Sequence, residues 1–316
     1  MTPLRIGISS CLLGDEVRFD GGHKRDPFLT ETLGPFVEWV RVCPEVEVGM
    51  GVPRETLRLV KVGGDTRMIT TRTGIDHTDE MRAFAARRAR ELAALGLRGY
   101  VLKKDSPSCG MTRVKVYDAE AKAPVRDGVG IYAAVLAAAF PALPIEEEGR
   151  LQDPVLRENF IERVFACDRL RTLFDGRWTL SDLIGFHTAH KMALLAHSTS
   201  AYHELGRLVA AAKGVPRGEL RRRYEALFMK TLARPATPAR HTNVLRHMAG
   251  HLKKLLDDGS RRELGECIEE YRRELVPLIV PLTLLRHHVR AHGVAYLAGQ
   301  TYLEPHPREL MLRNHV

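Results

Sequence analysis

The pattern of apolar and polar positions divides the chain into two parts of different character. Over the first 148 residues, short β-prone runs alternate with segments of helical periodicity. Strands are predicted at Leu4–Ser9, Val37–Val42, Tyr100–Lys103 and Leu143–Glu146, a hairpin at Arg58–Thr71, and helices at Thr78–Ala94 and Gly128–Ala139. Strands separated by helices imply an α/β domain with a mostly parallel, Rossmann-like sheet that is covered on both faces.

The pattern changes at residues 148–152, where strand signals end and helical periodicity continues to the end of the chain. Helices are predicted at 154–174, 180–196, 201–213, 217–232, 237–257, 260–273 and 278–292. We therefore expect an α/β domain over residues 1–148 and an all-α domain over residues 149–316.

The positive charge of the chain is confined to the predicted helical domain. Residues 1–148 contain 21 Lys and Arg and 21 Asp and Glu, whereas residues 149–316 contain 27 and 18, which gives a net charge of +9. Such a basic region is typical of a protein that binds nucleic acid, and a solvated basic helical surface is the alternative.

No apolar run approaches the ~20 residues that span a bilayer, and the N-terminal segment lacks the pattern of a secretory signal. We therefore expect a cytoplasmic protein with no membrane partner. No stable protein partner is implied.

Three cysteines each follow a predicted strand: Cys11, Cys43 and Cys109. Because the carboxyl ends of parallel strands meet at one edge of a sheet, these thiols are expected to converge. Five cysteines without a secretory signal do not suggest disulfides. Three single cysteines fit a [4Fe–4S] cluster with one iron free of protein ligands. Spacing alone leaves a zinc site, or buried thiols without metal, as alternatives.

Other polar side chains in the same loops are candidates for the chemistry of this site. Glu45 lies two residues after Cys43, which suits a general acid or base. Ser106 and Ser108 precede Cys109, and either hydroxyl could bond a substrate or stabilise a local turn. Three charged side chains are candidates for substrate binding: Asp20, Arg54 and Lys104.

Five short motifs from these loops, taken in order, resemble the thiouracil desulfidase family over residues 4–140. They are Ser9–Gly14, Val17–Gly21, Cys43–Glu45, Gly51–Arg54 and Lys103–Gly110, with Phe19 where many members have Tyr. The resemblance implies that Cys11, Cys43 and Cys109 hold a [4Fe–4S] cluster, whose free iron takes the thiocarbonyl sulfur of a thiolated pyrimidine. It also implies catalytic roles for Glu45 and for Ser106 or Ser108.

In the second half, helical spacing groups His187, His190 and Lys191 on one side of the helix predicted at 180–196. His187 and Lys191 are therefore candidates for binding the phosphates of a nucleic acid substrate. A half-buried helix face is the alternative, and a metal site is disfavoured because the Glu of H-E-x-x-H is missing.

Four segments of the second half resemble a helical domain of formerly unknown function that often follows the desulfidase domain: Phe186–Lys191, Asn243–His251, Val280–Arg286 and Gln300–Pro307. The fused arrangement is similar to bacterial tRNA thiouridine desulfidases. It implies an enzyme that converts a thiolated uridine of tRNA, 4-thiouridine above all, into uridine and sulfide. The alternatives are a desulfidase of free 2-thiouracil and a non-catalytic RNA-binding or redox-sensing cluster protein.

Overall fold

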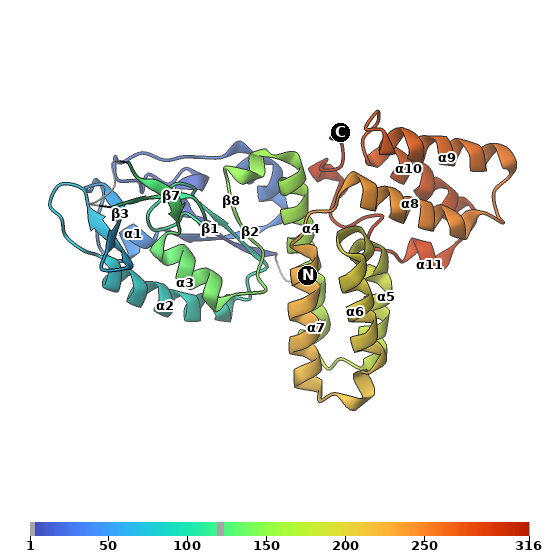
Figure 1. Cartoon of the computed structure of the whole chain (residues 1–316), viewed down its shortest axis with the longest axis horizontal. Coiled ribbons are helices and arrows are strands. Elements are labelled where there is room, and N and C mark those ends of the chain that lie inside the picture. Colours follow the sequence, from blue (N-terminus) through green and yellow to red (C-terminus); the bar gives the residue numbers. More distant parts are fainter. Residues whose placement is uncertain (1–3, 119–122, 316) are drawn as a thin grey trace. The chain divides into compact units, whose positions relative to one another are not determined.

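The computed structural model describes residues 4–118 and 123–315. The chain forms two compact units that divide between Gln152 and Asp153 (Figure 1). The first unit combines helices and strands and the second is entirely helical, which confirms the predicted fold class. No helix in the described part of the chain is long and apolar enough to cross a membrane.

A four-stranded parallel sheet forms the centre of the first unit, in the order β2-β1-β5-β8. Its strands are β1 (Arg5–Ser9), β2 (Glu38–Val42), β5 (Gly99–Leu102) and β8 (Ile145–Glu147). Ile6 and Ile8 of β1 are fully buried. Gly7 lies between them, where a Cβ would be 2.2 Å from the ring of Tyr100. Any side chain larger than that of glycine at this position would therefore clash with Tyr100 of the neighbouring strand β5.

A second sheet, in the order β4-β3-β6-β7, contains the predicted hairpin. Its strands are β3 (Leu57–Val62), β4 (Asp65–Thr70), β6 (Val114–Tyr117) and β7 (Val125–Gly128). Strands β6 and β7 were not predicted from the sequence. Three of the four β7 residues are exposed, so this strand lacks the apolar face that identifies a strand.

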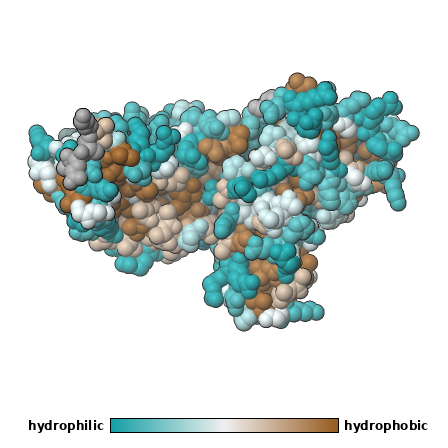
Figure 2. Space-filling view, viewed as in Figure 1, coloured by the Kyte–Doolittle hydropathy of each residue, from teal (hydrophilic) through white to brown (hydrophobic). Residues whose placement is uncertain are grey.

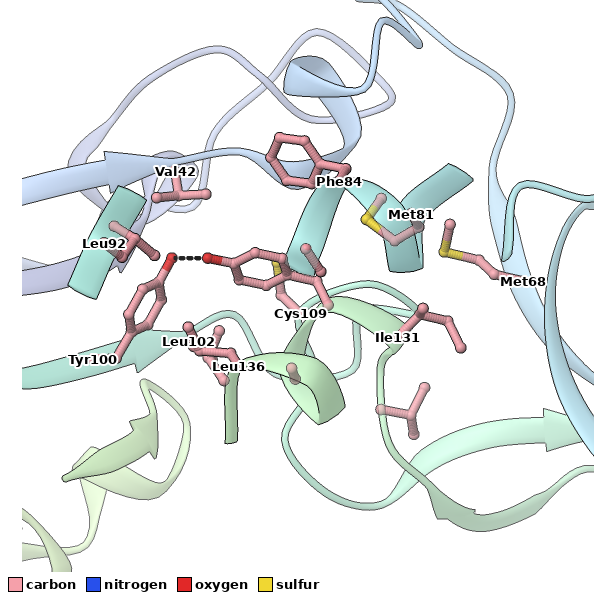
Figure 3. Close-up of a cluster of buried hydrophobic side chains, with 14 of the residues drawn as sticks. Val42, Met68, Met81, Phe84, Leu92, Tyr100, Leu102, Cys109, Ile131 and Leu136 are labelled. Atoms are coloured by element: carbon pink, nitrogen blue, oxygen red, sulfur yellow. Dashed lines mark hydrogen bonds between the residues drawn. The ribbon is translucent and has the colours of Figure 1, made fainter. Parts of the chain in front are cut away.

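The helix predicted to begin at Gly128 begins at Ile131 instead, because Gly128 ends β7. Gly130 has the extended conformation of an N-cap, with φ −62° and ψ 143°. This helix, α3 (Ile131–Ala139), packs along α2 (Thr78–Leu95), and the one-turn helix α1 (Pro44–Glu47) follows β2 (Figure 1). Beneath them lies a core in which the hydroxyls of Tyr100 and Tyr132 are 3.0 Å apart, with Cys109 nearby (Figure 3).

The helical unit contains the seven predicted helices, although the helix predicted at 237–257 ends at Leu252 and the short helix at Ala295–Ala298 was not predicted. Its helices are α4 (Pro154–Asp175), α5 (Leu180–His197), α6 (Thr199–Ala210), α7 (Arg217–Leu232), α8 (Pro238–Leu252), α9 (Asp258–Arg272), α10 (Ile279–Ala291) and α11 (Ala295–Ala298). The helix predicted at 201–213 begins two residues earlier, because the Ser198 side chain accepts the N–H of Ala201 as an N-cap. Residues of α5, α8, α9 and α10 form most of one buried apolar cluster in this unit.

Candidate active site

A cavity of about 300 Å³ lies at the carboxyl ends of three adjacent parallel strands, and three cysteines line it. Cys11 lies in a 3₁₀ turn after β1, Cys43 caps α1 after β2, and Cys109 lies in the loop after β5. The strand order β2-β1-β5 explains why cysteines so distant in sequence reach one cavity.

The three thiols share an environment that disfavours bare thiolates. Burial raises the pKa of Cys11 to about 11, and the nearby Cys43 thiol raises it further. Burial also raises the pKa of Cys43 and of Cys109. A bound metal centre deprotonates such thiols outright, because its positive charge replaces the lost hydration.

The chemistry of the donor set fits an iron–sulfur cluster. Each cysteine of a [4Fe–4S] cluster binds a different iron, so its ligands stand further apart than those of a single ion. Three soft donors around one cavity therefore match a cluster with three protein ligands.

Glu45 lies on the same cavity, two residues after Cys43 in the first turn of α1, and the side chains of Ser106, Ser108 and Arg54 bond its carboxylate. The hydroxyl of Ser108 donates to its Oε1 at 2.5 Å. The Nε and Nη2 of Arg54 donate to its Oε2 at 2.9 and 2.5 Å. The Glu45 side chain is only 15% exposed, so the carboxylate is held in one position at the edge of the cavity.

The two candidate serines occupy different positions. Ser106 lines the cavity, whereas Ser108 is 1% exposed and lies behind it against Glu45. The Ser106 hydroxyl accepts the N–H of Cys109 at 3.1 Å and donates to Oε1 of Glu45 at 3.4 Å, a longer bond than that from Ser108. Ser106 is thus placed to meet a ligand, and Ser108 is placed to orient Glu45.

The N-terminal end of α3 holds in place the loop that contains Ser106 and Ser108. The N–H of Ala133 donates to the carbonyl of Ser108 at 3.1 Å, and the N–H of Gly130 donates to the carbonyl of Gly110 at 2.7 Å. A Cβ at Gly130 would lie 2.4 Å from the Ser108 oxygen. The late start of α3 therefore serves the site, because the extended backbone at Gly130 packs directly on this loop.

The predicted substrate-binding side chains of the first unit lie in three different settings. Arg54 lines the cavity, but its guanidinium is already bonded to Glu45 and to the carbonyls of Val17 and Gly51. It is therefore placed to hold Glu45 rather than to capture an anion. Lys104 is exposed at the rim of the cavity. Asp20 is exposed outside the cavity lining, where it accepts the N–H of Gly22 at 3.1 Å.

His187 of the helical unit is buried rather than on an exposed basic face, so the buried helix face that the sequence left open as the alternative is the one present. Its side chain is 4% exposed, and its Nδ1 lies 3.1 Å from the hydroxyl of Tyr224. Burial lowers its pKa to about 4, and the nearby Lys191 lowers it further, so the ring is neutral at pH 7. Helical spacing alone could not distinguish the buried side of α5 from its exposed side. Lys191 is half-buried beside it.

Two carboxylates that were not predicted from the sequence support the loop that contains Cys109. Glu148 accepts the Lys104 N–H at 2.7 Å and pairs with the Lys103 ammonium group, which lines the cavity. Glu147 accepts the N–H of Met111 at 2.7 Å. Their position in the sequence could have indicated this role, because they lie at the end of β8. That strand ends at the same edge of the sheet as the strands that precede the cysteines.

Comparison with known proteins agrees with this geometry. The pattern of the 2-thiouracil desulfurase family matches residues 6–148, and that of a protein family of unknown function (DUF1722) matches residues 191–307. The uncharacterized protein YbgA of Escherichia coli (strain K12) is 34% identical over 153 residues, which cover 48% of this chain and 90% of YbgA. The chain belongs to the 2-thiouracil desulfurase family.

Two further proteins are similar to this desulfurase family member. The uncharacterized protein YbbK of Bacillus subtilis (strain 168) is 31% identical over 110 residues, 33% of this chain and 72% of YbbK. A solved [4Fe-4S]-dependent thiouracil desulfidase, TudS, is 28% identical over 50% of this chain and 99% of its own, with a TM-score of 0.40. The family match at residues 6–148 includes every residue that lines the cavity.

Proposed function

We propose that this enzyme removes sulfur from a thiolated uridine of tRNA, 4-thiouridine above all, and releases uridine and sulfide. The single observation that supports the chemistry is the cavity in which three thiols, a fixed carboxylate and a hydroxyl meet. Because the proposed substrate is tRNA, we also propose that the enzyme acts in the cytoplasm.

The cofactor we propose is a [4Fe–4S] cluster held by Cys11, Cys43 and Cys109. When bound, it supplies an iron without a protein ligand that acts as a Lewis acid toward sulfur. Lys103 and Lys104 at the edge of the cavity add positive charge beside the developing sulfide.

The residues of the chain account for the remaining steps. Glu45 is placed to take a proton from a water molecule as the water oxygen bonds to the thiocarbonyl carbon. The carbon–sulfur bond then breaks, and sulfur leaves as sulfide with the protons of that water. No electrons are gained or lost, because water oxygen replaces sulfide sulfur at the same oxidation level. Ser106, at the cavity wall, is placed to hydrogen-bond the pyrimidine ring.

The charge of the second unit favours tRNA over a free base. Residues 149–316 carry the whole net charge of +9, and a small base needs no such surface. Hydrophilic residues cover much of the visible face around α9 (Figure 2). Desulfidation of free 2-thiouracil is the second candidate, supported by the family to which the chain belongs.

A direct comparison of substrates tests the proposal. Anaerobically reconstituted enzyme would be given tRNA that contains 4-thiouridine and, separately, free 2-thiouracil, and sulfide release would be measured for both. We expect a kcat/KM for the tRNA at least ~10-fold above that for the free base. If the enzyme released sulfide from free 2-thiouracil but not from tRNA, its function would instead be desulfidation of the free base.

Arg54 is expected to act as a positioning residue. The Arg54→Ala substitution removes both N–H bonds to Glu45, so kcat is expected to fall about 10- to 100-fold, the usual effect of losing a partner that orients a group in a metal site. KM for 2-thiouracil is expected to change little. A rise in KM at unchanged kcat would instead assign Arg54 to substrate binding. Arg41→Ala, a change at an exposed arginine of β2, is the matched control.

Binding of tRNA is expected to weaken as salt rises. If the helical unit contacts about four phosphates, the dissociation constant rises about 100-fold between 50 and 200 mM salt, because bound cations are displaced from the RNA. Turnover of free 2-thiouracil, an uncharged base, serves as the control and is expected to stay nearly constant. Dissociation constants measured at equilibrium at four salt concentrations check this dependence. A dissociation constant that does not change with salt would contradict a phosphate-binding surface.

A further inference from the structure

Five ring side chains from three helices form two neighbouring groups on the helical unit. His247 and His251 of α8 have centroids 5.3 Å apart, and His251 lies 5.2 Å from Tyr296 of α11. The ring centroids of Tyr202 and His203, both of α6, are 5.0 Å apart, and burial together with the nearby Tyr202 raises the pKa of Tyr296. We name these five residues the ring strip. Four of them are exposed and Tyr202 is half-buried, so the strip is not part of the core.

The fold holds the ring strip in place through a buried amide. Gln300 is 3% exposed, and its Nε2 donates to the carbonyl of Thr188 at 2.9 Å and to that of Tyr296 at 3.4 Å. Its Oε1 accepts the N–H of Met192 at 3.3 Å. Gln300 therefore ties α11, with its exposed Tyr296, to the middle of α5.

The buried His187 supports the other end of the strip. Its ring lies parallel to that of Tyr202, with centroids 6.5 Å apart and an interplanar angle of 9°. The hydroxyl of Tyr224 fixes the His187 ring from the buried side. His187 thus belongs to the support of an exposed aromatic surface, although it does not itself reach solvent.

Three cations lie on the segments that carry the ring strip or that pack against them. Lys191 lies beside His187, Lys254 lies two residues after the end of α8, and Arg290 lies on α10, which packs against α11. Within residues 4–118 and 123–315, no carboxylate forms an ion pair with these three side chains, whereas many other arginines of the unit are paired. Their charge is therefore available to an anionic partner.

We infer that the ring strip binds unpaired nucleotides of the RNA substrate, with bases stacked on its rings and phosphates near the three cations. This inference rests on the proposed function and names the part of the substrate that the helical unit contacts. Exposed rings with interspersed cations form the usual platform for single-stranded RNA, because every base offers a flat face for stacking. A duplex keeps its bases inside and would gain nothing from exposed rings.

The test compares variants of the full-length protein in binding a fluorescent single-stranded 12-nucleotide oligouridine. Tyr296→Ala and, separately, His251→Ala are expected to weaken binding about 5- to 100-fold, the range for loss of one stacked base. Tyr296→Phe keeps the ring and is expected to bind within about 2-fold of wild type. Because stacking does not depend on counterions, the ratio of the dissociation constants of the Tyr296→Ala and Tyr296→Phe variants is expected to be the same at high salt.

Several outcomes would overturn the inference. They are a wild-type protein that does not bind the oligonucleotide, Ala variants that bind as well as wild type, and a Phe variant as weak as the Ala variant. His251→Ala tests the strip from a second helix if Tyr296→Ala fails to fold, as judged by thermal melting.

The same proteins, assayed on thiolated tRNA and free 2-thiouracil, separate this inference from the proposed function. If wild type does not desulfurise tRNA, the proposed function fails whatever the oligonucleotide result. If Tyr296→Ala turns over tRNA with an unchanged KM, the strip inference alone fails.

Discussion

Replacing Glu45 by Gln is expected to lower the rate of sulfide release about 10²- to 10⁴-fold, the usual contribution of a general acid or base. Gln keeps the size of the side chain and can still contact Ser108 and Arg54, but it cannot take a proton from water. The iron content of the protein is expected to be unchanged, because no bond to a cysteine is lost. Single-turnover sulfide release under anaerobic conditions measures the chemical step directly.

The control for Glu45→Gln is Glu38→Gln, the same change on the exposed strand β2, where the carboxylate pairs with Arg5 at 3.2 Å. This variant is expected to keep the wild-type rate. If Glu45→Gln also kept nearly the wild-type rate, another group would have to activate the water, and the role proposed for Glu45 would be wrong.

Replacing Cys109 by Ala is expected to remove most of the bound iron and to reduce turnover at least ~100-fold. The Cys109 side chain is 5% exposed, so no water or other donor of the chain readily takes the place of its sulfur. Loss of Lewis-acid assistance is worth several kcal/mol of transition-state stabilisation, which corresponds to at least this factor in rate. Iron analysis and sulfide release on the same anaerobic sample measure both effects.

Cys267→Ala provides the matched control for Cys109→Ala. Cys267 lies half-buried on α9 of the helical unit, far in sequence from the cavity lining. Its replacement is expected to leave iron content and turnover unchanged. Equal iron in the Cys109→Ala variant and in wild type would show that Cys109 is not a cluster ligand.

Much of the fold follows from the sequence because the elements with a clear apolar pattern are those that build the core. The helices of the second unit and the parallel strands β1, β2, β5 and β8 lie close to their predicted bounds. Strand β7 was missed because its pairing with β6, rather than its own burial, keeps it in the sheet. The start of α3 was misplaced for a related reason, since Gly130 is extended through contacts with the loop around Ser108 and Gly110.

The site was predictable to the extent that topology determines it. Residues that directly follow parallel strands meet at one edge, so the order of strands and helices along the chain is enough to place Cys11, Cys43 and Cys109 together. Sequence could not distinguish Ser106 from Ser108, because only the path of the loop decides which hydroxyl faces the cavity. The pairing of Arg54 with Glu45 depends on side-chain directions that no spacing rule contains.

The most direct measurement of the central claim is the iron and acid-labile sulfide content of the anaerobically reconstituted wild-type chain, together with its absorption spectrum. We predict about four irons and four sulfides per chain and the broad visible absorption of a [4Fe–4S] cluster. Stoichiometric zinc, or no metal after reconstitution, would contradict the proposed desulfidase site.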